Sequence, residues 1–122
     1  MRFFAQFSRF CAQIGGFMSR NIAIFASGNG TNAENIIKYF SGNKDIKVKI
    51  VMANKTDAFV LERAHRLGIP TLYINREQWA DATHILTLLH EQQIDFIVLA
   101  GFLARIPDAL LHAYPNRIVN IH

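Results

Sequence analysis

Two polar side chains at the end of the sequence have the types and the spacing of an acid–base pair. Asn120 and His122 are two residues apart in the apolar segment 117–122, and residues i and i+2 of a strand point to the same face. An amide and an imidazole on one face can orient a substrate and supply a proton to a developing oxyanion. A strand-end turn former and a solvated terminal ring are the alternative interpretation, and both stay open on these residues alone.

A glycine-rich loop near the start of the sequence is the second candidate. Residues 27–32 read Ser-Gly-Asn-Gly-Thr-Asn, between an apolar run at 22–26 and a segment with helical spacing at 33–40. A strand, a glycine loop and a helix direct backbone N–H groups at one anion, and Asn32 is predicted to cap that helix. The loop lacks the Gly-Lys-Ser/Thr of a P-loop and the third glycine of a dinucleotide fingerprint. A phosphate site and an ordinary tight turn therefore both remain open.

The other reactive side chains do not form a site of a familiar type. Four histidines fall in predicted helices, namely His65, His84, His90 and His112. Because no Cys, Asp or Glu stands near them at metal-ligand spacing, we predict solvated helix faces and no metal site. The single cysteine, Cys11, has no base in view to activate it, and the sequence has no Gly-x-Ser-x-Gly pattern.

Strand and helix patterns alternate from residue 21 onward. Apolar runs predict strands, and apolar residues three and four apart predict helices. The predicted strands are 21–26, 46–53, 70–74, 95–100 and 117–122, and the predicted helices are about 32–41, 60–67, 76–92 and 107–113. Alternation of this kind predicts an α/β fold with a doubly wound, Rossmann-like, mostly parallel sheet and helices on both faces.

The predicted fold selects the segments where a ligand would bind. In an open parallel sheet, ligands bind beyond the carboxyl ends of the strands. The segments that follow strands and carry polar residues are 27–32, 54–55, 101–105 and 120–122. Because a strand stands at the last residue, we also expect the sequence to be the N-terminal part of a longer protein.

Length, composition and charge bound the class of protein. With 122 residues, 51% of them hydrophobic and 18% charged, the chain suits one globular domain or a piece of one. A lone cysteine excludes an internal disulfide, which is typical of a cytoplasmic protein. The net charge of +4 is spread and mixed in sign, so we predict no nucleic-acid binding. No apolar run is long enough to span a bilayer, and we predict no membrane partner.

The first residues differ from the rest. Five of the ten Phe fall in residues 1–17, which contain no acid, and apolar residues there keep helical spacing. A transit-like or membrane-surface segment has this pattern. An extension from an upstream start codon is the alternative, because Met18 is followed directly by the first strand. We favour the second interpretation and assign residues 1–18 to an extension outside the fold and 19–122 to the folded domain.

Three segments taken together resemble one family. Residues 24–32 (IFASGNGTN), 98–102 (VLAGF) and 118–122 (IVNIH) have the order and spacing found in the phosphoribosylglycinamide formyltransferases, also called glycinamide ribonucleotide transformylases. Residues 53–64 are similar as well. The resemblance covers about residues 20–122, which would be the N-terminal part of a folate-dependent formyltransferase domain.

The resemblance implies an enzyme of de novo purine (IMP) biosynthesis. Such an enzyme transfers a formyl group from the cosubstrate 10-formyltetrahydrofolate to the amine of glycinamide ribonucleotide. Gly30, Thr31 and Asn32 match positions that hold the nucleotide substrate. Asn120 and His122 match the catalytic pair, with His122 as proton donor and stabiliser of the tetrahedral oxyanion, and Asn120 bonded to the formyl oxygen.

The resemblance also implies a folate subsite. Its matched positions are Leu103, Ala104, Arg105 and Ile106, which act mostly through the backbone, together with Arg76, which matches a folate-contacting arginine, and Asn120. Neither a metal nor a macromolecular partner is implied, and the expected assembly is a monomer or a homodimer.

The sequence departs from the family at two points. Residues 103–106 read Leu-Ala-Arg-Ile, where many members have Met-Arg-Ile-Leu after the phenylalanine, so the folate contacts are expected to differ in detail. The family's catalytic aspartate lies downstream of the position matched by His122. We therefore expect the 122-residue chain alone to have little or no transferase activity.

Three alternative functions stay open. Formyltetrahydrofolate deformylase shares the glycine loop and the Asn-x-His strand but passes the formyl group to water, and it usually carries a regulatory domain that seventeen residues cannot form. Methionyl-tRNA formyltransferase fits less well, because the glycine loop suits a small phosphate ester. A non-catalytic nucleotide-binding module would use residues 27–32 alone.

Overall fold

The computed structural model describes residues 20–121, so the extension, Cys11 and His122 lie outside the described residues. The strands are β1 (Arg20–Ala26), β2 (Ile46–Ala53), β3 (Thr71–Tyr73), β4 (Phe96–Ala100) and β5 (Ile118–Ile121). The helices are α2 (Thr31–Tyr39), α3 (Phe59–Arg66), α4 (Arg76–Ala80), α5 (Ala82–Glu91) and α6 (Asp108–Ala113).

The strands form one sheet in the order β3-β2-β1-β4-β5, and all four pairings are parallel. The chain builds outward from β1 to β3 and then returns to add β4 and β5 on the other side of β1. The order therefore reverses between β1 and β4. This topology confirms the predicted doubly wound α/β fold and places its switch point at the carboxyl ends of β1 and β4.

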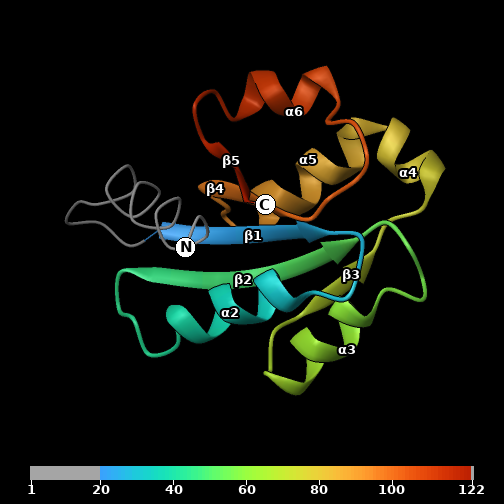
Figure 1. Cartoon of the computed structure of the whole chain (residues 1–122). Helices are drawn as coiled ribbons and strands as arrows, with labels where there is room; N and C mark the ends of the chain where they lie inside the picture. Colours follow the sequence, from blue (N-terminus) through green and yellow to red (C-terminus); the bar gives the residue numbers. More distant parts are fainter. Residues whose placement is uncertain (1–19, 122) are drawn as a thin grey trace.

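Helices cover both faces of the sheet (Figure 1). One face is packed by α2 and α3, and the other by α5 and α6. The helix residues buried on the first face are Ala33, Ile36, Ile37, Val60 and Ala64, and those buried on the second face are Ile85, Leu89 and Leu110. The helical stripes expected from the sequence are thus the core-facing stripes.

Burial along the strands follows their position in the sheet. Residues 22–26 of the central strand β1 are completely buried, because β1 has a strand on each side and helices on both faces. In β2 the first residues alternate and the last four are continuously buried, as predicted. The edge strand β3 is shorter than the predicted 70–74, because Pro70 has no N–H to donate to the ladder. The carbonyl of Pro70 still accepts a hydrogen bond from Val51 N–H.

The prediction of one helix over 76–92 is wrong, because the chain forms two helices separated at Asp81. This residue has φ −90° and ψ 83°, outside the helical region, and its carboxylate accepts a 3.3 Å hydrogen bond from Thr83 N–H. The side chain competes with the main chain for helical hydrogen bonds, so it ends α4 and caps α5. The apolar stripe continues across the break, since Ile85 and Leu89 are buried and Trp79 packs against the same core.

No helix within residues 20–121 is long and apolar enough to cross a membrane.

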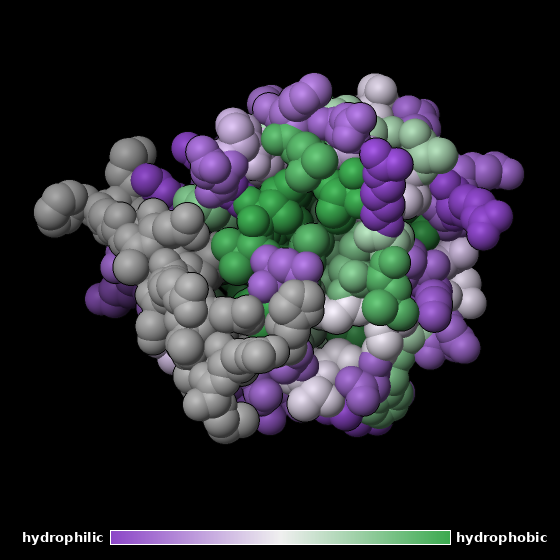
Figure 2. Space-filling view, turned by 45° about the horizontal axis from the view of Figure 1, so that its top comes forward, coloured by the Kyte–Doolittle hydropathy of each residue, from purple (hydrophilic) through white to green (hydrophobic). Residues whose placement is uncertain are grey.

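The face that carries α4, α5 and α6 shows hydrophobic residues gathered near its middle, with hydrophilic residues around them (Figure 2).

Candidate functional site

Two loops meet at the switch point of the sheet. Residues 27–32 follow β1, and residues 101–106 follow β4, its hydrogen-bonded neighbour. A pocket of about 140 Å³ lies between them, lined by residues 28–32 from the first loop and by Ala100 and Gly101 from the second. The predicted substrate residues Gly30, Thr31 and Asn32 therefore lie together in one pocket, where the topology rule places a ligand.

The glycine loop is shaped by its own side chains and by α3. Asn29 Oδ1 accepts hydrogen bonds from Thr31 N–H (3.1 Å) and from the Thr31 hydroxyl (3.0 Å). The carbonyl of Gly28 accepts from Val60 N–H at 3.2 Å, which ties the loop to the first turn of α3. The loop is thus a fixed element of the fold.

The prediction that Asn32 caps the following helix is wrong. The N-cap of α2 is Gly30, which has φ 82°, and no side chain caps this terminus. Asn32 is already the second residue of the helix. Because Thr31 N–H donates to Asn29 Oδ1 instead, the helix begins one residue earlier than the pattern predicted, and Thr31 and Asn32 of its first turn line the pocket.

The 101–106 segment is held from two sides. The buried hydroxyl of Ser27 accepts a 2.9 Å hydrogen bond from Leu103 N–H. The indole N–H of Trp79 donates a 2.8 Å hydrogen bond to the Arg105 carbonyl. The side chain of Leu103 is 77% exposed at the surface. The backbone of the segment is therefore fixed, while the side chains of Leu103 and Arg105 are exposed.

A second pocket, of about 310 Å³, lies beside the 101–106 segment. It is lined by Asn54, Lys55, Asn75, Arg76, Trp79 and Ala104. A reciprocal capping box between Asn75 and Gln78 (2.8 and 3.0 Å) starts α4 and so fixes the place of Arg76. Two cationic side chains, those of Lys55 and Arg76, and the aromatic ring of Trp79 thus line the same pocket. Asn54 Oδ1 is buried and meets no donor among the described residues.

Asn120 is the member of the predicted catalytic pair that lies within the described residues. It is exposed on β5 and is paired in register with Leu99, while its neighbour Ile121 is buried in the core of the opposite face. The alternation inferred from the sequence is thus present in β5. Asn120 lines neither of the two pockets, and His122 lies outside the described residues.

The structure brings some predicted residues together and adds others. Of the predicted folate-contacting residues, Arg76 and Ala104 line the same pocket, whereas Leu103, Arg105 and Ile106 line neither pocket. Ser27 was predicted as the first residue of the glycine loop but was given no role of its own, and Trp79 was not predicted to act at the site. A signal for Trp79 was present in the sequence. Asn75 and Gln78 have capping-box spacing, which predicts that a helix begins directly after the strand before it, at the carboxyl edge of the sheet.

No group of three or more His, Cys, Asp or Glu in the described part of the chain is placed to hold a metal ion.

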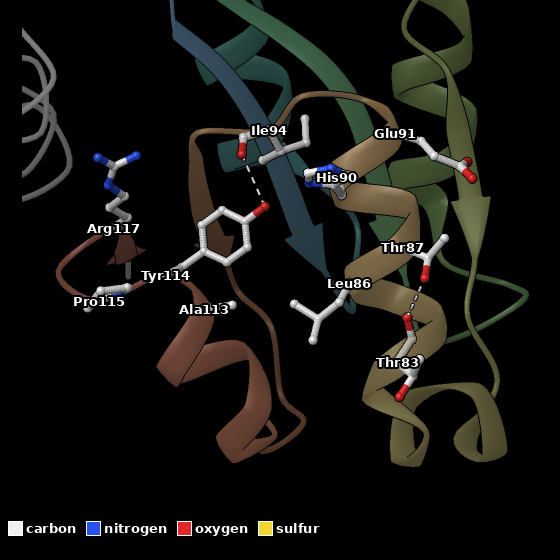
Figure 3. Close-up of a pocket in the computed structure, with 10 residues that line it drawn as sticks. All are labelled: Thr83, Leu86, Thr87, His90, Glu91, Ile94, Ala113, Tyr114, Pro115 and Arg117. Atoms are coloured by element: carbon white, nitrogen blue, oxygen red, sulfur yellow. Dashed lines mark hydrogen bonds between the residues drawn. The ribbon is translucent and has the colours of Figure 1, made fainter.

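A groove of about 900 Å³ lies at the other end of the sheet. It runs between α5 and the segment from α6 to β5 (Figure 3). Ile94 and Arg117, which precede β4 and β5, line it, so it opens at the amino ends of the strands. The tyrosine hydroxyl of Tyr114 donates to the Ile94 carbonyl at 3.1 Å across the groove. Its position separates it from both loops of the candidate site.

The sequence of the chain is similar to those of known proteins. Residues 20–122 match the family described as Formyl transferase. The phosphoribosylglycinamide formyltransferase of Bacillus subtilis is 36% identical over 110 residues, covering 84% of this chain and 55% of the relative. The enzyme of the same name from Escherichia coli is 39% identical over 108 residues, covering 84% and 50%. The chain spans about half the length of the curated relatives it matches.

Solved structures show the same architecture. Glycinamide ribonucleotide transformylase 1 from Geobacillus kaustophilus superposes with a TM-score of 0.77 at 35% identity, covering 85% of this chain and 58% of that one. Phosphoribosylglycinamide formyltransferase from Anaplasma phagocytophilum gives 0.78 at 33% identity, covering 85% and 50%. These matches confirm the resemblance inferred from the motifs. Because the family match extends over the whole described fold and both loops of the candidate site, the chain belongs to the formyl transferase family.

Proposed function

We propose that the protein transfers a formyl group from 10-formyltetrahydrofolate to the amine of glycinamide ribonucleotide, a step of purine biosynthesis. The observation that carries this proposal is the similarity of residues 20–122 to proteins named phosphoribosylglycinamide formyltransferase. The presence of two pockets at the carboxyl edge of the sheet supports the proposal, and we assign one reactant to each.

The smaller pocket suits the phosphate of the nucleotide. Gly30, Thr31 and Asn32 lie at the N-terminus of α2. The first N–H of the helix, that of Thr31, is bonded to Asn29 Oδ1, but the N–H groups that follow it and the positive dipole end favour an anion. We propose that these residues hold the phosphate-bearing substrate.

The larger pocket suits the folate. Trp79 offers an aromatic face, Lys55 and Arg76 offer positive charge for carboxylates, and Asn54 Oδ1 offers an acceptor that a ligand N–H would satisfy. The neighbouring Leu103, Ala104, Arg105 and Ile106, together with Arg76 and Asn120, are the proposed folate-contacting residues. The support for them is the family resemblance and, for Arg76 and Ala104, their shared pocket.

The proposed chemistry is acyl transfer through a tetrahedral intermediate. The substrate amine forms a bond to the formyl carbon, the bond from that carbon to N10 breaks, and the proton lost by the amine is balanced by one gained at N10. Asn120 bonds to the formyl oxygen as negative charge develops there, and His122 donates the proton. The exposed position of Asn120 at the carboxyl end of β5 is consistent with this role.

The alternatives are less well supported. The relatives compared above are named for transfer to glycinamide ribonucleotide, whereas a deformylase would release formate to water. A module that binds only a nucleotide would not require the second pocket beside the 101–106 segment.

We further propose that the protein is cytoplasmic, that it is a monomer or homodimer, and that residues 1–18 lie outside a catalytic domain that begins at 19. A native N-terminus at Met18 or Ser19, found by N-terminal sequencing, would support this boundary.

The test measures the appearance of formylated glycinamide ribonucleotide with the full-length protein. We expect Asn120→Ala and His122→Ala each to lower kcat by about a hundredfold or more, because each removes stabilisation made only in the transition state. Asn35→Ala on α2 and His112→Ala on α6 are matched controls, because both side chains are exposed away from the pockets. Formate release at the same rate without the amine would establish the deformylase instead, and full activity of His122→Ala would refute its catalytic role.

A further inference from the structure

We infer that Ser27 and Trp79 are positioning residues that hold the 101–106 segment in the conformation that receives the folate cosubstrate. This inference rests on the proposed function and deepens it. Neither residue is among those that the family resemblance implies.

Ser27 joins the two loops of the candidate site. It is the first residue of the glycine loop, is 2% exposed, and accepts the 2.9 Å hydrogen bond from Leu103 N–H across 76 residues of sequence. A buried hydroxyl is retained at little cost only where it is hydrogen-bonded. Because Ser27 directly follows the completely buried residues 22–26 of β1, its hydroxyl is a fixed point to which the second loop is bonded.

Trp79 holds the same segment from the opposite side. Its indole N–H donates the 2.8 Å bond to the Arg105 carbonyl. Its ring packs edge-to-face on Phe102 (centroids 4.9 Å apart) and on Phe25 of β1 (5.6 Å), and Phe25 and Phe102 also contact each other (5.6 Å). The three rings form a cluster that anchors the start of the segment, while the indole N–H fixes its middle.

The two hydrogen bonds lie on either side of Ala104, the residue of the segment that lines the proposed folate pocket. They fix the backbone at 103 and at 105, on either side of Ala104. Since both bonds are made to backbone groups, they hold for any side chains at these positions. The two bonds therefore fix the main chain of 103–106 although its side chains depart from those common in the family. The loss of either bond should therefore weaken folate binding and leave the nucleotide pocket intact.

The test compares the two Michaelis constants in the full-length protein. For Ser27→Ala and for Trp79→Phe, we expect KM for 10-formyltetrahydrofolate to rise about tenfold, the value of one lost hydrogen bond, while KM for glycinamide ribonucleotide and kcat change by less than about twofold. Phenylalanine keeps an aromatic ring in the cluster but removes the N–H together with the second ring of the indole. Ser27→Ala, whose side chain does not line the folate pocket, is therefore the variant that isolates one lost hydrogen bond. A merely structural role would lower the melting temperature and the active fraction without separating the two constants.

Two variants provide matched controls at the other end of the sheet. Ser41→Ala removes an exposed hydroxyl, and Tyr114→Phe removes another aromatic donor to a backbone carbonyl; neither residue lines the two pockets. We expect both to leave the two KM values within about twofold of the wild-type values. Equal changes in both KM values for Ser27→Ala and Trp79→Phe, or no change in either, would overturn the inference.

Amide hydrogen exchange separates this inference from the proposed function. In Ser27→Ala, Leu103 N–H loses its acceptor, so we expect its exchange to become at least about tenfold faster while that of Val98, within β4, stays the same. If the wild-type protein transfers no formyl group, the proposed function fails, but faster exchange at Leu103 would still support the positioning bond. Unchanged exchange at Leu103 would exclude the bond even in an active enzyme.

Discussion

Gly30 is the residue of the candidate site that tolerates the least change. It has φ 82°, a conformation that costs other residue types strain, and a Cβ built on it would lie 2.5 Å from Val60 Cβ and 2.7 Å from Val60 Cα. Since a backbone atom of α3 stands in the way, rotation of a side chain cannot relieve the contact. The glycine is needed both for the turn and for the close approach of the loop to α3.

Substitution of Gly30 should therefore destabilise the fold. We expect Gly30→Ala to lower the free energy of unfolding by about 3 kcal/mol, from the strained φ together with overpacking against Val60. Gly68→Ala is the matched control, because Gly68 has φ 78° but open space around a Cβ, and it should cost only about 1–2 kcal/mol. Urea unfolding of both variants gives the difference, and equal costs would show that the contact with Val60 is relieved.

Individual residues show where sequence patterns stop being sufficient. The position of the glycine loop could be predicted because its glycines stand between a strand pattern and a helix pattern. The type of Asn32 suits a cap, but the competing bond from Asn29 to Thr31 depends on the path of the loop. Ser27 is uninformative in sequence, since its role depends on Leu103, which lies 76 residues away.

At the scale of elements, the break between α4 and α5 has functional consequences. A continuous apolar stripe predicted one helix, because periodicity does not register a single residue that leaves the helical region. Asp81 ends α4 after five residues, and the capping box at Asn75 fixes its start. The short helix so defined carries Arg76 and Trp79 to the carboxyl edge of the sheet.

A second contact between elements lies at the opposite edge. Tyr114, which follows α6, donates its hydrogen bond to the carbonyl of Ile94, which precedes β4 (Figure 3). Burial raises the pKa of the Tyr114 phenol above its usual value, the negative charge of Asp95 raises it further, and the positive charge of Arg117 opposes both. The neutral phenol is therefore the form that the folded protein favours.

The raised pKa predicts a change in stability at alkaline pH. Because the folded-state pKa lies above the unfolded value of 10.0, the contribution of Tyr114 is fully present below pH 10 and is lost as the pH rises through the folded-state pKa. We expect the difference in unfolding free energy between wild type and Tyr114→Phe to be constant from pH 7 to 9 and to shrink above pH 10. Urea unfolding at each pH measures it, and a difference that is independent of pH up to 11 would contradict the assignment.

For the whole molecule, the topology determines where the site lies. The alternating patterns predicted a doubly wound sheet, and such a sheet has one switch point. The sequence alone therefore predicted that the candidate loops lie close together. The reversal between β1 and β4 then creates the pocket between residues 28–32 and 100–101. Side-chain bonds across loops, such as those of Ser27 and Trp79, follow from packing rather than from pattern and could not be predicted in this way.

The extent of the chain relative to its relatives bears on its activity. Within residues 20–121, β5 has a neighbouring strand on one side only, and the chain spans about half the length of the relatives it matches. In the family that the chain resembles, a catalytic aspartate lies downstream of the position matched by His122.

We expect a protein made of residues 1–122 alone to show kcat at least about a hundredfold below that of the full-length protein, because it would lack the aspartate that in the family orients the histidine and controls its protonation. Circular dichroism should show a cooperative unfolding transition for the short protein, since both faces of its sheet are covered by helices; this control separates inactivity from unfolding. Turnover by the folded 122-residue protein within about tenfold of the full-length rate would show that Asn120 and His122 suffice for the chemistry.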